Sequence, residues 1–161
     1  MYKLDTDNKD HNSIIFWFKT WENKVQNEDY ESAKNLFEND VVSFGTWMNV
    51  VEGLEKLCAN QWKSVWPTIN NFKVLTDTLY IQISPDRLLA YSILVWDSTG
   101  YKKNGSSFKR NGRATVTLKR ININDPWKYI HNIFIESRYS LKILWWYLNK
   151  IIKFIAFSIF C

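Results

Sequence analysis

Apolar residues recur at intervals of three and four along the first 66 residues, which is the spacing of amphipathic helices. Asn12 and Ser13 are good N-cap residues, and the apolar stripe after them predicts a first helix. Asp29 begins a second predicted helix. A third is predicted over residues 51–66, because Pro67 cannot continue it. The apolar stripes of the first and third helices are Ile14, Trp17, Trp21, Val25, Leu54, Leu57, Cys58, Trp62, Val65 and Trp66.

Beyond Pro67 the helical spacing disappears, and apolar runs are separated by turn residues. Typical turn sequences occupy residues 84–86, 97–100 and 104–105. The predicted strands are 72–83, 88–96, 108–121 and 127–135, with a short one at 41–44 before the third helix. Because helices come first and antiparallel strands follow, the pattern predicts an α+β fold. We expect a cone, formed by a strongly curved antiparallel sheet wrapped around three N-terminal helices.

The two ends of the chain differ from this central pattern. Residues 1–11 are polar and acidic, without the apolar run of a signal peptide, and we expect a flexible start. Residues 12–137 form the predicted domain. Residues 138–161 contain four basic residues and no acid, and they are rich in Ile, Leu, Phe and Trp. We expect an extra amphipathic helix there that docks on a protein surface or self-associates. Contact with a membrane surface and a true membrane anchor are the alternatives, although Lys150 and Lys153 disfavour an anchor.

Aromatic residues make up 17% of the chain, which points to a core or pocket built from large flat side chains. The net charge is +5, but residues 1–137 carry 17 basic and 16 acidic side chains, so the excess belongs to the C-terminal segment. Cys58 and Cys161 form neither a disulfide framework nor zinc-ligand spacing. We therefore expect no metal and no cofactor, and a reducing, cytoplasmic location, with peripheral membrane contact as the alternative.

Four segments in the right order resemble SnoaL-like domains of the nuclear-transport-factor-2-like superfamily, which also contains ketosteroid isomerases. They are FENDVVSFG at 37–45, VEGLEKL at 51–57, GRATVTLKR at 112–120 and WKYIH at 127–131. The resemblance covers residues 12–137. It implies the same curved-sheet cone, a small-molecule pocket inside it, and a homodimer formed through the sheet.

The chain departs from this superfamily at positions that carry chemistry. Where the steroid isomerases have a Tyr and an Asp, alignment on Asp40 places Trp21 and Gly45. Family members often have a second His and then a Ser after the closing motif, but here these positions are Ile133 and Ile135. The oxyanion donor and the general base of that reaction are therefore absent, and we do not expect isomerase-type proton abstraction.

Two predicted strands could bring polar groups into the cone. Arg113 and Thr115 alternate with apolar residues, and Trp127, Tyr129 and His131 alternate in the same way. If these faces line the cone, Arg113 would bind a carboxylate and His131 would be the candidate catalytic residue. The alternative is that Arg113 pairs with an acid and His131 is a half-buried structural residue. The predicted pocket residues are Trp17, Trp21, Phe44, Trp62, Trp96, Arg113, Thr115, Trp127, Tyr129 and His131.

Three functions remain open on this basis. The leading hypothesis is a domain that binds a small apolar or aromatic molecule, which can carry an acid group, without evident catalysis. The enzymatic alternative is an isomerase, cyclase or hydratase that uses His131 as acid–base. The third is a dimeric association module whose C-terminal segment docks on a partner or membrane. Seven basic residues between 102 and 120 could bind nucleic acid, but no RNA-binding motif accompanies them, so we favour a solvated hairpin.

Overall fold

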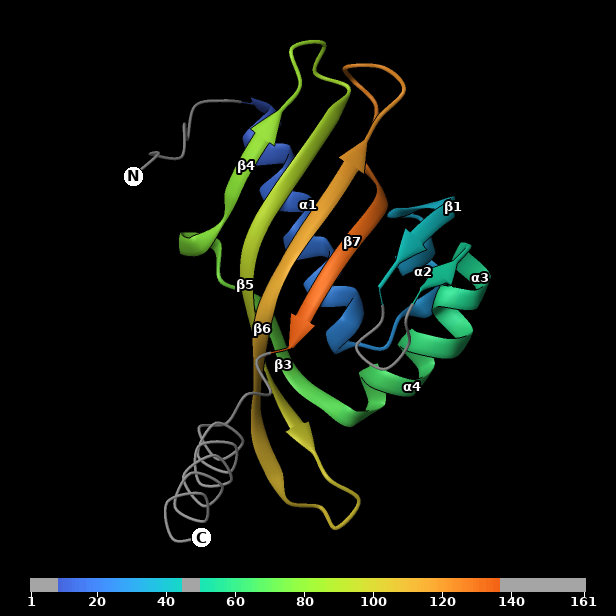
Figure 1. Cartoon of the computed structure of the whole chain (residues 1–161), viewed down its shortest axis with the longest axis vertical. Coiled ribbons are helices and arrows are strands. Elements are labelled where there is room, and N and C mark those ends of the chain that lie inside the picture. Colours follow the sequence, from blue (N-terminus) through green and yellow to red (C-terminus); the bar gives the residue numbers. More distant parts are fainter. Residues whose placement is uncertain (1–8, 45–49, 137–161) are drawn as a thin grey trace, which may run out of the picture.

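The computed structural model describes residues 9–44 and 50–136, which form one helix-covered sheet (Figure 1). The helical elements are α1 (Lys9–Gln26), α2 (Tyr30–Lys34), α3 (Leu54–Leu57), the π-helical turn η1 (Cys58–Trp62), α4 (Lys63–Val65) and the 3-10 turns η2 (Trp66–Thr68) and η3 (Thr76–Thr78). The first helix already includes Lys9 and Asp10, before its predicted start at Asn12 or Ser13, and Asp10 is buried in an ion-pair cluster. The second starts as predicted, since the Asp29 side chain accepts a hydrogen bond from the Ser32 backbone N–H.

Within the described ranges the sheet has seven strands in the order β2-β1-β7-β6-β5-β3, with β4 also paired to β5. The strands are β1 (Phe37–Ser43), β2 (Val51–Glu52), β3 (Ile69–Val74), β4 (Tyr80–Ile83), β5 (Leu89–Tyr101), β6 (Ser107–Lys119) and β7 (Lys128–Glu136). All pairs are antiparallel except β1 with β7, which is parallel. The α+β prediction and the curved, open sheet are confirmed.

Three predicted element boundaries are wrong. Residues 51–52 pair with β1 as a strand, and the helical segment begins only after Gly53, which has a φ of 89°. The predicted strand 72–83 is interrupted by η3 and divides into β3 and β4. Residues 97–100 are not a turn but the end of β5, where the Ser98 hydroxyl donates to the Arg110 carbonyl oxygen and Gly100 leaves room for the Phe108 ring.

The core lies between the concave face of the sheet and the helices. In Figure 1, α1 lies behind β4–β7, and α2, α3 and α4 lie beside β1. The fully buried side chains include Ile14 and Phe18 of α1 together with Leu94, Val116 and Leu118 of the sheet. Burying these faces against each other supplies the main driving force for the fold. The opposite face of β5, β6 and β7 is not covered by any helix of the described ranges.

Most of the predictions for the two ends of the chain concern residues outside the described ranges. Residues 1–8 and the predicted C-terminal helix lie outside the described residues. Within the ranges that are described, no helix combines the length and the apolar character needed to cross a membrane.

Candidate functional site

Strand β6 turns its apolar residues toward the helices and most of its polar residues outward. The inward residues are Arg110, Gly112, Ala114, Val116 and Leu118, and the outward ones include Arg113 and Thr115. The prediction that Arg113 and Thr115 line the pocket is therefore corrected. The prediction that side chains of β6 alternate between two faces is correct. The face that packs against α1 is the apolar one, so the polar side chains lie outside. Arg110 is an even number of residues away from the buried apolar residues of β6. This spacing could have identified it from the sequence as the inward arginine.

A β-bulge in β7 separates Tyr129 from His131. Tyr129 pairs with Leu118 and His131 with Thr117, so two steps along β7 correspond to one step along β6. A bulge inserts one extra residue and shifts the alternation of the strand. Tyr129 is consequently buried on the concave side, whereas His131 lies with Thr117 on the outer face. The prediction that these two residues share one face is wrong.

His131 is held in place on the outer face by neighbouring strand β1. Its Nδ1 atom lies 2.9 Å from the carbonyl oxygen of Val42, so Nδ1 carries a proton and donates it to that oxygen. The ring also makes an edge contact with Phe44, with the ring centroids 5.9 Å apart. Phe44 is thus outside the cone as well. These contacts match the structural alternative for His131 rather than a catalytic role.

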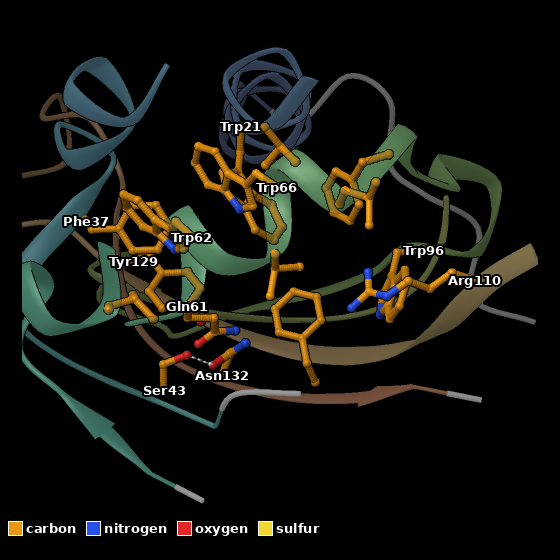
Figure 2. A pocket seen from close by; sticks show the side chains of 16 residues that line it. Trp21, Phe37, Ser43, Gln61, Trp62, Trp66, Trp96, Arg110, Tyr129 and Asn132 are labelled. Atoms are coloured by element: carbon orange, nitrogen blue, oxygen red, sulfur yellow. Dashed lines mark hydrogen bonds between the residues drawn. The ribbon is translucent and has the colours of Figure 1, made fainter. Parts of the chain in front are cut away.

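The concave side of the sheet contains a cavity of about 60 Å³ (Figure 2). Four of the predicted pocket residues line it: Trp21, Trp62, Trp96 and Tyr129. The other wall residues are Val25, Phe37, Ser43, Leu57, Gln61, Val65, Trp66, Ile69, Phe72, Arg110, Asn132 and Phe134. Trp17 stands one layer behind and stacks on Tyr129 at a centroid distance of 6.0 Å.

Aromatic rings form most of the cavity wall and hold each other in place. Phe37 contacts both Tyr129 and Trp62, at centroid distances of 4.4 and 4.9 Å. On the other side, Trp21 contacts Phe72 at 5.2 Å. Offset and edge-to-face packing of this kind adds about 0.5–1.5 kcal/mol per pair beyond burial. The rings therefore form a rigid apolar wall rather than a loosely filled space.

The π-helical turn η1 shapes one side of the cavity. Its wider winding places Leu57 and Trp62, five residues apart, on the same inward side, and both line the cavity together with Gln61. Single π-helical turns often occur at functional sites. The apolar spacing alone predicted a regular helix here, so Gln61 was not among the predicted site residues.

One end of the cavity carries hydrogen-bond donors and a positive charge. The guanidinium carbon of Arg110 lies 4.8 Å from the centroid of the Trp96 ring, and both residues are buried. The indole Nε1 atom of Trp96 is buried and has no hydrogen-bond partner within the described part of the chain, and the same holds for Trp21, which lies in another part of the wall beside Trp66 (Figure 2). Among the described residues of the wall, Arg110 is the only charged one. This end therefore presents one guanidinium and one indole N–H group.

The other end carries a compact set of neutral polar groups (Figure 2). The Ser43 hydroxyl donates to Asn132 Oδ1 at 2.6 Å, and both residues are almost fully buried. The Gln61 Oε1 atom is buried without a partner within the described residues. Burial raises the pKa of the Tyr129 hydroxyl far above its ordinary value, so this group stays protonated and can donate a hydrogen bond.

Trp127, the remaining predicted pocket residue, belongs to a different cluster. Its indole N–H donates to the Ser13 hydroxyl, and the Arg120 guanidinium lies 4.2 Å from its ring centroid. Arg120 also forms an ion pair of 2.9 Å with Asp10, which in turn pairs with Arg87 at 2.7 Å. This cluster fixes the start of α1 to the ends of β5 and β6. Gly45, the residue at the expected general-base position, lies outside the described residues.

Comparison with known proteins identifies the fold. No protein-family model and no curated protein matches the chain. A putative calcium/calmodulin-dependent protein kinase II association domain from Xanthomonas campestris matches with a TM-score of 0.70 and 16% identity, over 86% of this chain and 95% of that chain. A nuclear transport factor 2 (NTF2-like) superfamily protein from Salmonella enterica serovar Typhimurium matches with a TM-score of 0.66 and 15% identity, over 81% and 93%. The chain has an NTF2-like fold.

A third structure agrees with this assignment. A ketosteroid isomerase-like protein from Erwinia carotovora atroseptica matches with a TM-score of 0.65 and 13% identity, over 81% of this chain and 98% of that chain. At these identities the likeness establishes the fold alone. The NTF2-like cone of this chain is nevertheless a well-filled one, since a cavity of about 60 Å³ holds only about four to six water molecules.

Proposed function

We propose that the chain binds a small organic acid in the cavity of its NTF2-like cone. The observation that carries the proposal is the pair of Arg110 and Trp96 in the cavity wall, where the buried indole N–H of Trp96 lacks a partner within the described residues. A carboxylate satisfies such donors and gains charge-assisted hydrogen bonds from a guanidinium. The aromatic wall then contacts the apolar body of the acid.

The size of the cavity limits the ligand class. Pockets for drug-sized molecules measure about 300–1,000 Å³, several times more than this one. The ligand is therefore a short carboxylic acid or one with a single small ring, and not a steroid or a polycyclic molecule.

Binding, rather than proton transfer, is the function that this site supports best. Within the described residues, the wall contains no carboxylate and no imidazole that could serve as a general base. The isomerase-type alternative relied on His131, which lies on the outer face. A cytoplasmic location remains a prediction from the sequence.

Intrinsic tryptophan fluorescence tests this proposal, because several tryptophans line the cavity. Acetate, propionate, butyrate and benzoate are titrated against the matching primary amides. We expect quenching by the acids and little by the amides. Arg110→Gln should weaken acid binding by at least about tenfold, and Arg113→Gln, on the outward side of the same strand, is the matched control. Equal responses to acids and amides, or equal losses in both variants, would reject the proposal.

The outer face of the sheet favours a second function, self-association through the sheet. Tyr91 and Ile93 on β5 and Ile133 on β7 are large apolar residues, and each is exposed by 41–47%. Thr115 and Thr117 of β6 lie between them in the sheet. Exposed apolar residues that gather on one sheet face are typical of an interaction surface. Sedimentation velocity over a range of concentrations tests this. We expect a dimer at high concentration that Thr115→Arg weakens and Asn23→Arg, on the exposed side of α1, does not.

A further inference from the structure

An exposed apolar face of the described sheet and an apolar stretch of sequence follow each other closely along this chain. The first is the outer face of β5, β6 and β7, where Ile93, Thr115 and Ile133 form one row across the three strands. Tyr91 and Thr117 form the next row with His131, and Leu89 extends the apolar strip along β5. A sheet in a folded domain is usually covered on each apolar face by another layer.

The apolar stretch of sequence is the C-terminal segment. On a helical wheel of residues 141–161, Lys142, Asn149 and Lys153 share one side. The opposite side is mostly apolar, with Leu144, Tyr147, Leu148, Ile151 and Ile155; Ser158 also lies there, and Lys150 lies at its margin. A segment with this pattern needs an apolar surface to cover its stripe, and the lysines on the other side then face water.

The length and position of this segment fit the outer face of its own chain. Residues 137–140 separate it from the end of β7, and connections of two to six residues are usual between a strand and a helix that packs back on the sheet. A helix of 21 residues is about 30 Å long, and the nine residues of β7 also extend over about 30 Å. A single helix that runs back along β7 is therefore long enough to cover the exposed rows of the sheet.

The charges of the outer face are compatible with this arrangement. Arg113 and Lys119 are the charged residues that β6 directs outward along the apolar rows, and both lie at the margins of the strip rather than in the central row. The lysines of the C-terminal segment point away from the sheet in such a helix, so the contact does not bring like charges together. An intrachain contact also needs no second molecule, which gives it the advantage of a high effective concentration.

We propose that residues 141–161 pack as an amphipathic helix on the outer face of β5, β6 and β7 of their own chain, and that they compete there with a second copy. The competition rests on the self-association proposed above, whereas the packing itself does not. The segment thus limits dimer formation to high protein concentration. A chain in which it is displaced dimerises more tightly.

Thiol labelling of the full-length chain tests the packing. Thr115→Cys is introduced in the centre of the outer face, in a Cys161→Ser background. Cys58 is buried, and burial raises the pKa of its thiol, so it reacts little. The rate of maleimide labelling is measured at protein concentrations below the onset of dimerisation. Ile151→Lys places a charge on the apolar side of the segment, and Asn149→Lys places the same charge on its polar side as the matched control.

The expected result is slow labelling of the introduced thiol in the Thr115→Cys parent and in the chain that also carries Asn149→Lys. In the chain with Ile151→Lys, labelling should be faster by at least about tenfold. Sedimentation of the same chains should show a tighter dimer for Ile151→Lys alone. Equal labelling rates in all three chains would overturn the packing, whatever their oligomeric state.

Two further outcomes distinguish packing of the C-terminal segment on the outer face from binding of a second copy or of a lipid surface. If no chain dimerises but the introduced thiol is still protected by the segment, self-association fails and the packing stands. If labelling rates are equal and the chain cosediments with phosphatidylserine-containing vesicles unless Ile151 is changed, the segment binds a lipid surface instead. That result would also overturn the proposal.

Discussion

Arg110 and Trp96 form a buried cation–π pair, with the guanidinium carbon 4.8 Å from the ring centroid. The planar guanidinium is thus held against the cavity wall, with its N–H groups in a fixed fork. Lysine carries the same charge but has neither the fork nor the flat surface that stacks on an indole. We therefore expect Arg110→Lys to bind carboxylates about tenfold more weakly than the parent, and less weakly than Arg110→Gln. Tryptophan quenching measures this order. Identical affinities for the Lys and Gln variants would contradict a role for the charge.

His131 should be dispensable for ligand binding but not for stability. Its ring donates to the Val42 carbonyl oxygen across the β1–β7 pair, outside the cavity. Loss of that hydrogen bond in His131→Ala should lower the free energy of unfolding by about 1 kcal/mol. Urea denaturation measures this loss, and the affinity for acids should stay unchanged. A loss of acid binding in a variant with normal stability would restore His131 to the site.

The buried Asp10 carboxylate should make the fold sensitive to acid. Its hydrogen bond from Arg87 lowers its pKa most, and Arg120 lowers it further, whereas burial opposes the shift. Because the pKa is lower in the folded than in the unfolded chain, this stabilisation is present above about pH 4 and is lost as the pH falls below it. Asp10→Asn should cost about 3–5 kcal/mol at neutral pH, since it leaves the Arg120 charge buried without its partner carboxylate.

Denaturation of the Asp10→Asn chain at several pH values provides the control. Its stability should fall less steeply than that of the parent as the pH drops below about 4, where the parent protonates Asp10. Parallel pH profiles for the two chains would show that Asp10 does not carry the acid sensitivity.

Tyr129 should produce the opposite effect at alkaline pH. Burial raises its pKa in the folded chain, despite the nearby Ser43 hydroxyl, which lowers it. The unfolded chain ionises this residue near about pH 10 and the folded chain does not, so stability decreases as the pH rises above about 10. Tyr129→Phe keeps the aromatic ring in the cavity wall and should weaken this alkaline decrease. Burial is also the main cause that raises the pKa of Tyr30, to about 12, so Tyr30 contributes to the same alkaline loss of stability. The Tyr30→Phe variant measures that contribution separately.

Gly100 and Phe108 should be coupled energetically across the β5–β6 hairpin. They are paired residues, and a Cβ atom at position 100 would lie 2.5 Å from Phe108 Cζ. Gly100→Ala should therefore displace the exposed Phe108 ring and destabilise the chain by about 0.5–1 kcal/mol. In a Phe108→Ala background the same change should cost much less. A double-mutant cycle measures the coupling, and additive effects would contradict the contact.

The architecture could be predicted from the sequence because its main signals are periodic. The α1 stripe from Ile14 to Val25 has a spacing that only a helix satisfies, and the alternating run 108–121 has that of a strand. Trp21, Trp62, Trp96 and Tyr129, four of the predicted pocket residues, lie in the cavity wall. Periodicity determines which residues share a face, but only packing against α1 decides which of the two faces is buried.

The errors in the site arise from irregularities that no repeat encodes. One extra residue in β7 moved His131 to the outer face while Tyr129 stayed inside. The π-helical turn brought Gln61 to the cavity. Arg110 and Arg113 are three residues apart and therefore lie on opposite faces of β6. The alternation was predicted correctly, but Arg113 was assigned to the inner face, where Arg110 lies.

The ion-pair cluster at Asp10 also has a consequence for biosynthesis. Its two partners follow it by 77 and 110 residues, so the beginning of the first helix is secured only after most of the sheet has left the ribosome. Contacts at such separations slow folding, because a long loop must close before they form. The N-terminal helix therefore keeps its tryptophan stripe exposed through most of translation, and this is the interval in which the nascent chain is most prone to aggregate.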